Sequence, residues 1–177
     1  SAPGQPCEML FPRLPRFHRS KKCANCTGFV NANQMEALAS HGYIAVGMDH
    51  TYGAMVTVFP DGRIVLNNPN ALVGKSGTPE FQRSSEIVEA TYAADVRFVI
   101  DQLALLDAGK VNSPLAGKFD LARVGLFGHS TGGGAIVLAC SRDARCKAGL
   151  GMDAWVEPIP ASVVPQAPSQ PFMFMRS

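Results

Sequence analysis

A glycine-rich turn between two apolar stretches constrains this sequence more than any other feature. Ala122–Phe127 is apolar enough for a strand, Gly128-His-Ser-Thr-Gly132 predicts a tight turn, and Ala135–Cys140 is a small, apolar run compatible with a helix. Glycines on both sides of Ser130 let the strand and the helix approach closely, because larger side chains would collide there. The stretch therefore predicts a strand, a turn and a helix, with Ser130 on a strained backbone at the turn.

In this context the G-x-S-x-G pattern is typical of a nucleophile elbow. Such a turn exposes the serine Oγ above the sheet and directs the first amide of the following helix at the same point. The chain has 17 glycines in 177 residues, so the bare pattern also arises by chance, and the interpretation depends on the strand and helix around it. Glycine-rich turns also bind phosphates, but neither a P-loop motif nor a suitable acidic residue supports that alternative here.

Length and composition fit one globular domain. The chain is 46% hydrophobic, which supplies a core, and its net charge of +2 implies no general attraction to nucleic acid or acidic membranes. We interpret an early basic cluster as a solvated N-terminal arm in preference to a nucleic-acid or lipid-surface patch; it comprises Arg13, Arg16, Arg19, Lys21 and Lys22. No signal peptide is visible and the first residue is Ser, so we interpret the chain as processed or as a fragment and leave its compartment open.

Five cysteines give two patterns. Cys23-Ala-Asn-Cys26 is a C-x-x-C, but no second pair or histidine pair completes a zinc site, so a zinc or redox module is a minor alternative. Cys140 and Cys146 are close enough in the chain for a short disulfide, and two buried free thiols are the other possibility. The odd number argues against a fully bridged secreted scaffold.

The chain divides into an irregular basic segment, residues 1–30, and a partial α/β domain, residues 31–177. Asn33–His41 predicts the end of a helix, with Gly42 as its stop. Tyr43–Met48 is almost continuously apolar, which predicts a parallel strand covered on both faces.

Strand and helix signals alternate through the rest of the chain. A hairpin is predicted around Pro60-Asp61-Gly62, and Thr78-Pro79-Glu80 predicts the start of a long helix. Short buried strands are predicted at Ala148–Met152 and from Pro171. One apolar stripe follows the long helix, made of Val88, Tyr92, Val96, Val99, Leu103 and Leu106. The pattern predicts the α/β class with a mainly parallel sheet and helices on both faces.

An activated serine requires a histidine base and a carboxylate that orients it. Asp153 follows the strand after the elbow helix, where such a carboxylate belongs, although a capping or loop aspartate would look the same. Asp143 is a weaker competitor on a charged turn that we expect to be exposed. No histidine follows Asp153, because His18, His41, His50 and His129 all precede Ser130. We therefore expect the fold to be incomplete at its C-terminus, with the base beyond Ser177.

Several segments together resemble the platelet-activating-factor acetylhydrolase family, in its plasma and type II forms and bacterial relatives. They are Ala37–Tyr43 with Asp49-His50, Asp95–Leu103, Phe119–Gly133 and Met152-Asp-Ala-Trp155. The last two are the most specific. Polyester and cutinase-like hydrolases share G-H-S-x-G-G but place the acid on a later strand, so the spacing from Ser130 to Asp153 favours the acetylhydrolases.

The resemblance implies an α/β-hydrolase fold that needs no metal or cofactor. It implies Ser130 as nucleophile, Asp153 as acid and the amide of Thr131 as one oxyanion donor. The family's second donor follows a Ser-His-Gly-x-Gly segment that is absent here, which would place it near Cys26 or Thr27. We also name His129, Trp155 and His50 as candidate residues of the substrate pocket.

We expect a serine ester hydrolase that cleaves short-acyl esters, with the sn-2 esters of phospholipids as a candidate class. Its partners would be a small ester or phospholipid, with transient contact to a membrane surface and no nucleic acid. The alternative from another class is a non-catalytic hydrolase-like binding protein or an inactive fragment, which the missing histidine supports. A polyester or cutinase-like hydrolase is the alternative within the same chemistry.

Overall fold

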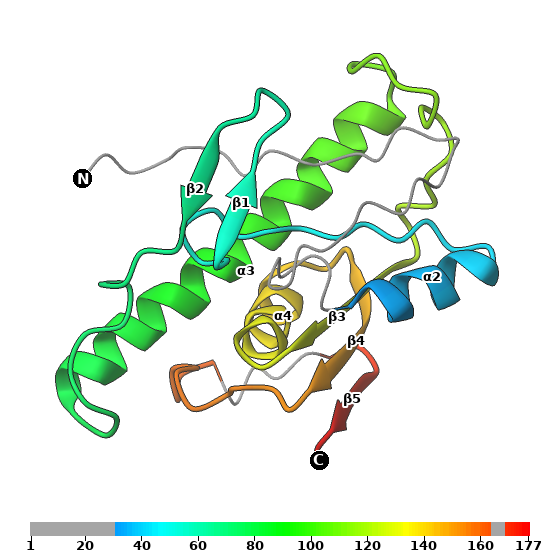
Figure 1. Ribbon diagram of the computed structural model, residues 1–177. Helices are drawn as coiled ribbons and strands as arrows, with labels where there is room; N and C mark the ends of the chain where they lie inside the picture. The colour runs from blue at the N-terminus through cyan, green and yellow to red at the C-terminus, as the bar shows by residue number, and fades with distance from the viewer. Residues whose placement is uncertain (1–30, 164–168) are drawn as a thin grey trace. The chain divides into compact units, whose positions relative to one another are not determined.

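A computed structural model describes residues 31–163 and 169–177 (Figure 1). The chain divides into two compact units, Ser1–Pro69 and Asn70–Ser177. The predicted boundary between residues 30 and 31 falls where the described residues begin, so it stays a prediction. In the part of the chain that the structure describes, no helix is long and apolar enough to cross a membrane.

The first unit contains a helix and a hairpin. Helix α2, Ala32–Ser40, ends as predicted before Gly42, whose φ of 87° favours glycine. Strands β1, Val56–Val58, and β2, Ile64–Leu66, pair in an antiparallel arrangement, with Val58 opposite Ile64. The predicted hairpin is therefore confirmed.

The strand predicted for Tyr43–Met48 is wrong, because residues 43–50 have no regular secondary structure. Tyr43 is 66% exposed and Ile44 45%, so this apolar run is not covered on both faces. A parallel strand requires neighbouring strands that accept and donate its backbone hydrogen bonds. No strand among the described residues pairs with this segment, and apolar composition alone cannot provide one.

The second unit begins with helix α3, Pro79–Asp107. The Thr78 side chain accepts a hydrogen bond from the Phe81 amide at 3.3 Å, and Pro79 occupies the first turn, so the predicted start is confirmed. The buried face holds most of the predicted stripe, namely Val96, Val99, Leu103 and Leu106.

Three parallel strands form the sheet of this unit, in the order β3-β4-β5 (Figure 1). They are β3, Val124–His129, β4, Cys146–Met152, and β5, Phe172–Met175. The strands pair in parallel, β3 with β4 and β4 with β5. All three were predicted, although β4 begins at Cys146, earlier than the sequence suggested, because it pairs with the start of β3.

Helix α4, Thr131–Arg142, packs on both β3 and β4, and α3 packs on α4 (Figure 1). The core of the unit lies along these contacts, since most of α4 from Gly133 to Cys140 is buried. A helical cover on the second face of the sheet stays a prediction. This arrangement places the carboxyl ends of β3 and β4 side by side, where the candidate site lies.

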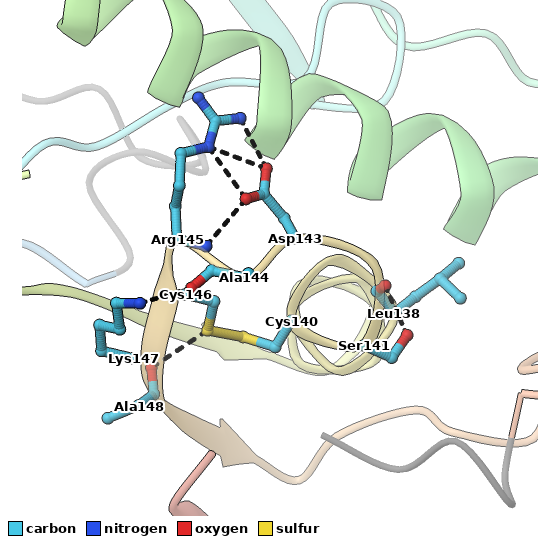
Figure 2. Close-up of a disulfide and its surroundings, with 9 residues drawn as sticks. All are labelled: Leu138, Cys140, Ser141, Asp143, Ala144, Arg145, Cys146, Lys147 and Ala148. Carbon is cyan, nitrogen blue, oxygen red and sulfur yellow. Dashed lines mark hydrogen bonds and ion pairs between the residues drawn. A yellow bond between two sulfur atoms is a disulfide. The ribbon is translucent and has the colours of Figure 1, made fainter. Parts of the chain in front are cut away.

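A disulfide joins the end of α4 to the beginning of β4, which settles the alternative left open by the sequence (Figure 2). Cys140 and Cys146 are bonded at 2.01 Å, and both residues are buried. The bond closes the turn between the helix and the strand, and it therefore fixes the amino end of β4 against α4.

Candidate active site

Ser130 lies at the turn between β3 and α4, in a backbone conformation that residues other than glycine rarely adopt. Its φ is 53° and its ψ is −122°, a region used almost only by glycine. Both main-chain polar groups of Ser130 are hydrogen-bonded: its amide donates to Met152 O at 3.0 Å, and its carbonyl accepts from Gly134 N at 3.1 Å. The strained turn predicted from the sequence is thus present, and Ser130 is exposed at its apex.

Gly128 shows why the turn requires glycine. A Cβ at this position would collide with the carbonyl of Gly132 and would lie 3.0 Å from the Gly133 amide nitrogen. Both are backbone atoms, which cannot move aside without displacing the start of α4. The close approach of strand and helix that the sequence predicted therefore depends on this residue.

The start of α4 supplies hydrogen-bond donors beside Ser130. Thr131 is the first residue of the helix, and amides in the first helical turn lack partners within the helix. The position also lies at the positive end of the helix dipole, which favours a developing negative charge. The role of the Thr131 amide as an oxyanion donor stays a prediction, and Cys26 lies outside the described residues.

Asp153 occupies the position on β4 that corresponds to Ser130 on β3. The last residues of the two strands, His129 and Met152, are partners in the parallel register, so Ser130 and Asp153 each follow a paired strand end. Asp153 also has a positive φ, 41°, and its amide donates to Met175 O at 2.8 Å. The structure thus brings the two sequence-predicted residues to the same edge of the sheet.

The Asp153 carboxylate is held in its charged form. Its Oδ1 accepts hydrogen bonds from the Ser177 amide at 2.9 Å and from the Ser177 hydroxyl at 3.2 Å. The pKa of Asp153 is lowered mainly by the Ser177 amide, with smaller contributions from the Ser177 hydroxyl and from the charges of His129 and Arg176. An ionised carboxylate is what a triad acid requires, because it must stabilise an imidazolium.

Asp143 lies at the opposite end of β4 and is not exposed, contrary to our expectation. Its exposure is 9%, and Arg145 covers it with bonds of 2.9 Å from Nε and 2.6 Å from Nη2 (Figure 2). Arg145 also reaches Asp101 Oδ1 of α3 at 2.6 Å. The Arg145 hydrogen bonds lower the pKa of Asp143 to about 2. Arg145 therefore connects Asp143 to α3. Asp143 precedes the amino end of β4, and this place excludes it as a partner of Ser130.

Trp155 is hydrogen-bonded to the elbow through its main chain. Its amide donates to the Ser130 carbonyl at 2.9 Å, and its ring packs against Phe81 with centroids 6.1 Å apart. The two rings contribute to a pocket of about 330 Å³ that also includes Ser85 and Gln82. Trp155 is thus a structural neighbour of Ser130, and its place in a substrate pocket stays a prediction.

The two candidate histidines have different surroundings. His129 is exposed at the end of β3, and its charge acts on Asp153. His50 belongs to the first unit, where its carbonyl accepts from Gly53 N at 2.8 Å. The contribution of either residue to substrate binding stays a prediction.

Sequence reasoning missed Glu89, a carboxylic acid inside the protein. Its exposure is 0%, and neither carboxyl oxygen has a hydrogen-bond partner among the described residues. Burial raises the pKa of Glu89 to about 8. The signal was present in the sequence, because Glu89 falls one helical turn from both Ser85 and Ala93 on the buried face of α3.

The family model of platelet-activating factor acetylhydrolase, isoform II, matches residues 79–177, more than half of the chain. The chain belongs to this family. The match begins at the first residue of α3 and includes the elbow, Ser130 and Asp153. The resemblance stated from the sequence is confirmed.

Individual relatives agree with the family. The chain is 27% identical to a platelet-activating factor acetylhydrolase of Bos taurus over 79% of its length, and it covers 35% of that protein. It is 26% identical to a probable 1-alkyl-2-acetylglycerophosphocholine esterase of Arthroderma benhamiae over 84% of its length, covering 34% of that protein. The chain thus spans about a third of the length of these acetylhydrolase-family relatives.

A solved structure agrees with the fold. The chain resembles a ferulic acid esterase from Streptomyces cinnamoneus with a TM-score of 0.58 and 29% identity, over 78% of this chain and 35% of that one. The acetylhydrolase-family chain thus has an α/β-hydrolase fold, and its parallel sheet is the part of that fold that carries the elbow.

Proposed function

We propose that this chain carries the nucleophile and the acid of a serine ester hydrolase. The observation that supports the proposal is the pairing of two strand ends: Ser130 and Asp153 directly follow His129 and Met152, which are register partners. The strained backbone of Ser130 adds to it, because a protein retains such strain where it has a functional use.

In the proposed reaction the Ser130 Oγ attacks the acyl carbon of an ester and transfers its proton to a histidine. The carbonyl oxygen becomes an oxyanion, which the Thr131 amide stabilises at the start of α4. The ester's carbon–oxygen bond then breaks, and the leaving alcohol takes the proton from the histidine. Water attacks the acyl-serine with help from the same histidine, which releases a carboxylic acid and restores Ser130.

Asp153 has a distinct part in this scheme. Its carboxylate accepts a hydrogen bond from the histidine, fixes the ring's tautomer and stabilises the positive charge that forms. The lowered pKa of Asp153 suits this task, because the group stays ionised while the histidine gains a proton. The histidine of this scheme stays a prediction.

The proposed substrates are esters with short acyl groups, including those of phospholipids. The names of two relatives, a platelet-activating factor acetylhydrolase and a probable 1-alkyl-2-acetylglycerophosphocholine esterase, support acetyl esters of ether phospholipids as the first class to test. The ferulic acid esterase supports esters in general.

A fluorophosphonate probe tests the proposal, because it forms a stable bond only with an activated serine. In the complete protein we expect one label per molecule, located on Ser130 by peptide mass spectrometry. Ser130→Ala should abolish labelling and lower ester turnover by several orders of magnitude. Ser141→Ala is the matched control, since this serine at the end of α4 donates to Leu138 O and should leave labelling unchanged.

The 177-residue chain alone should react negligibly, because a serine without a base stays protonated. Absence of labelling in the complete protein would contradict the proposal and favour a non-catalytic binding protein. Labelling that persists in Ser130→Ala would contradict the choice of nucleophile.

A further inference from the structure

Glu89 of α3 is a fully buried carboxylic acid. It has no exposed surface, and within residues 31–163 and 169–177 neither Oε1 nor Oε2 has a hydrogen-bond partner. Since burial raises its pKa to about 8, the group carries its proton at neutral pH. A protonated carboxyl differs from a carboxylate in one decisive way: it is a hydrogen-bond donor.

The Glu89 carboxyl lies against Gly134, a residue of α4 that has no room for a side chain. A Cβ at Gly134 would be 2.5 Å from Glu89 Oε1, and it would also collide with the carbonyl oxygen of Trp155. The carboxyl and this carbonyl therefore converge on the same small space beside α4. Two oxygens repel each other in a dry interior unless a proton lies between them.

The groups beside Glu89 are those that hold the elbow. The amides of Gly134 and Trp155 both donate to a single acceptor, the main-chain carbonyl of Ser130, at 3.1 and 2.9 Å. The backbone of Ser130 thus depends on the same helix turn and the same segment after β4 that meet at Glu89.

We propose that Glu89 is a positioning residue for Ser130, in which a protonated carboxyl donates to the carbonyl of Trp155 and fixes the segment after β4 against α4. The inference rests on the proposed function, because it takes Ser130 as the nucleophile. Glu89 touches no reacting atom in this scheme and acts through Trp155.

Among the groups that meet beside Glu89, the Glu89 carboxyl is the one whose protonation changes near pH 8. On its own helix, Tyr92 interacts with it electrostatically. From α4 it meets Gly134, and the Trp155 carbonyl of the segment after β4 reaches the same space beside Gly134; neither group titrates. When Glu89 loses its proton above about pH 8, the donor disappears and a negative charge faces a carbonyl oxygen. The elbow then loses its support, and the reactivity of Ser130 should fall.

The test compares Glu89→Gln and Glu89→Leu in the complete protein by the rate of fluorophosphonate labelling at neutral and alkaline pH. Gln keeps a donor at every pH, so we expect near wild-type labelling at neutral pH without the fall above about pH 8. Leu has no donor, so we expect labelling to be roughly tenfold slower at neutral pH, because small displacements of a nucleophile are costly. Glu86→Gln, one turn earlier on α3, is the matched control and should resemble the wild type.

Infrared difference spectra provide a readout that is independent of activity. The wild type minus Glu89→Gln should show the carbonyl band of a protonated carboxyl at neutral pH, and this band should disappear as Glu89 ionises. If Glu89→Leu does not fold, the Gln variant and the infrared band decide.

The proposal is overturned if the band belongs to a carboxylate at neutral pH, if Gln and Leu label equally fast, or if the alkaline fall persists in Gln. An unlabelled wild type overturns the proposed function and this inference together. A labelled wild type with any of the three preceding results overturns the role of Glu89 alone, so the two failures are distinguishable.

Discussion

Ser130 and Asp153 share an uncommon backbone feature: each follows the end of its strand with a positive φ, 53° and 41° respectively. The two strands are neighbours, and their last residues are register partners. Both side chains are thereby turned out of the regular strand path at the same edge of the sheet. The site thus contains two neighbouring residues with strained backbones. The free energy that this strain costs the folded protein can be measured by substitution.

Replacing Ser130 by glycine should raise the free energy of unfolding by about 1 kcal/mol, because relief of backbone strain exceeds the added entropy of the unfolded chain. Ser130→Ala, which keeps a Cβ, should be nearly neutral. Denaturant unfolding of both variants measures the difference. Ser141→Gly is the control: this helical serine has no such strain, so glycine there should lower stability. Equal stability of the Gly and Ala variants at position 130 would contradict the strain.

Gly128→Ala should destabilise the protein by about 2–3 kcal/mol, because the new methyl group meets the backbone of Gly132 and Gly133. Gly132→Ala is its matched control, since no atom of the described residues lies within 4 Å of a Cβ there, and alanine is the better helix former. Thermal or denaturant unfolding should therefore separate the two variants in opposite directions. If both lower stability alike, the close approach at Gly128 is not the cause.

Asp143→Asn should lower the free energy of unfolding at neutral pH. It should also make this free energy less dependent on pH in the acidic range. The folded pKa of Asp143, about 2, lies below its ordinary value of 3.8, so its stabilisation is present above 3.8 and is lost as pH falls through about 2. Since Arg145 is partly exposed, we expect about 1–2 kcal/mol. Unfolding measured across acidic pH checks this. Glu80→Gln, which removes an exposed pair with Arg83, should leave the acid limb unchanged.

Glu89 predicts an opposite dependence on pH. Its folded pKa, about 8, lies above its ordinary value of 4.5, so its stabilisation is complete below 4.5 and is lost as pH rises through about 8. The loss should be on the order of 5 kcal/mol, and Glu89→Gln should remove this slope. Unfolding of the wild type and the variant at several pH values measures it, with Glu86→Gln retaining the wild-type slope. A slope that persists in Glu89→Gln would assign it to another group.

The sequence predicted the parts of the fold that depend on neighbouring residues. The cap at Thr78 and the elbow around Ser130 were found because their signals lie within a few positions. Asp153 was found because β4 ends directly before it.

The parts that depend on distant residues were not predictable in the same way. Tyr43–Met48 has the composition of a buried strand, yet composition does not supply a strand to pair with. Asp143 was expected on the surface, whereas Arg145 and its bond to Asp101 of α3 cover it. Glu89 is buried because α4, which is distant in the sequence, packs on α3 and excludes water. The residues next to Glu89 in the sequence indicate this burial only through their helical spacing.

The disulfide between Cys140 and Cys146 has a consequence for the biogenesis of the protein. Its partners are only six positions apart, so the bond closes a small loop, whereas Cys7, Cys23 and Cys26 lie far earlier in the chain. Each doubling of loop length adds about 0.6 kcal/mol to the cost of closure, so oxidation during synthesis favours the native pair over mispairing. Once α4 and β4 dock, both sulfurs are shielded from thiol exchange. A chain that meets an oxidant therefore closes the bond between α4 and β4 at a lower entropic cost than a bond from either cysteine to Cys7, Cys23 or Cys26.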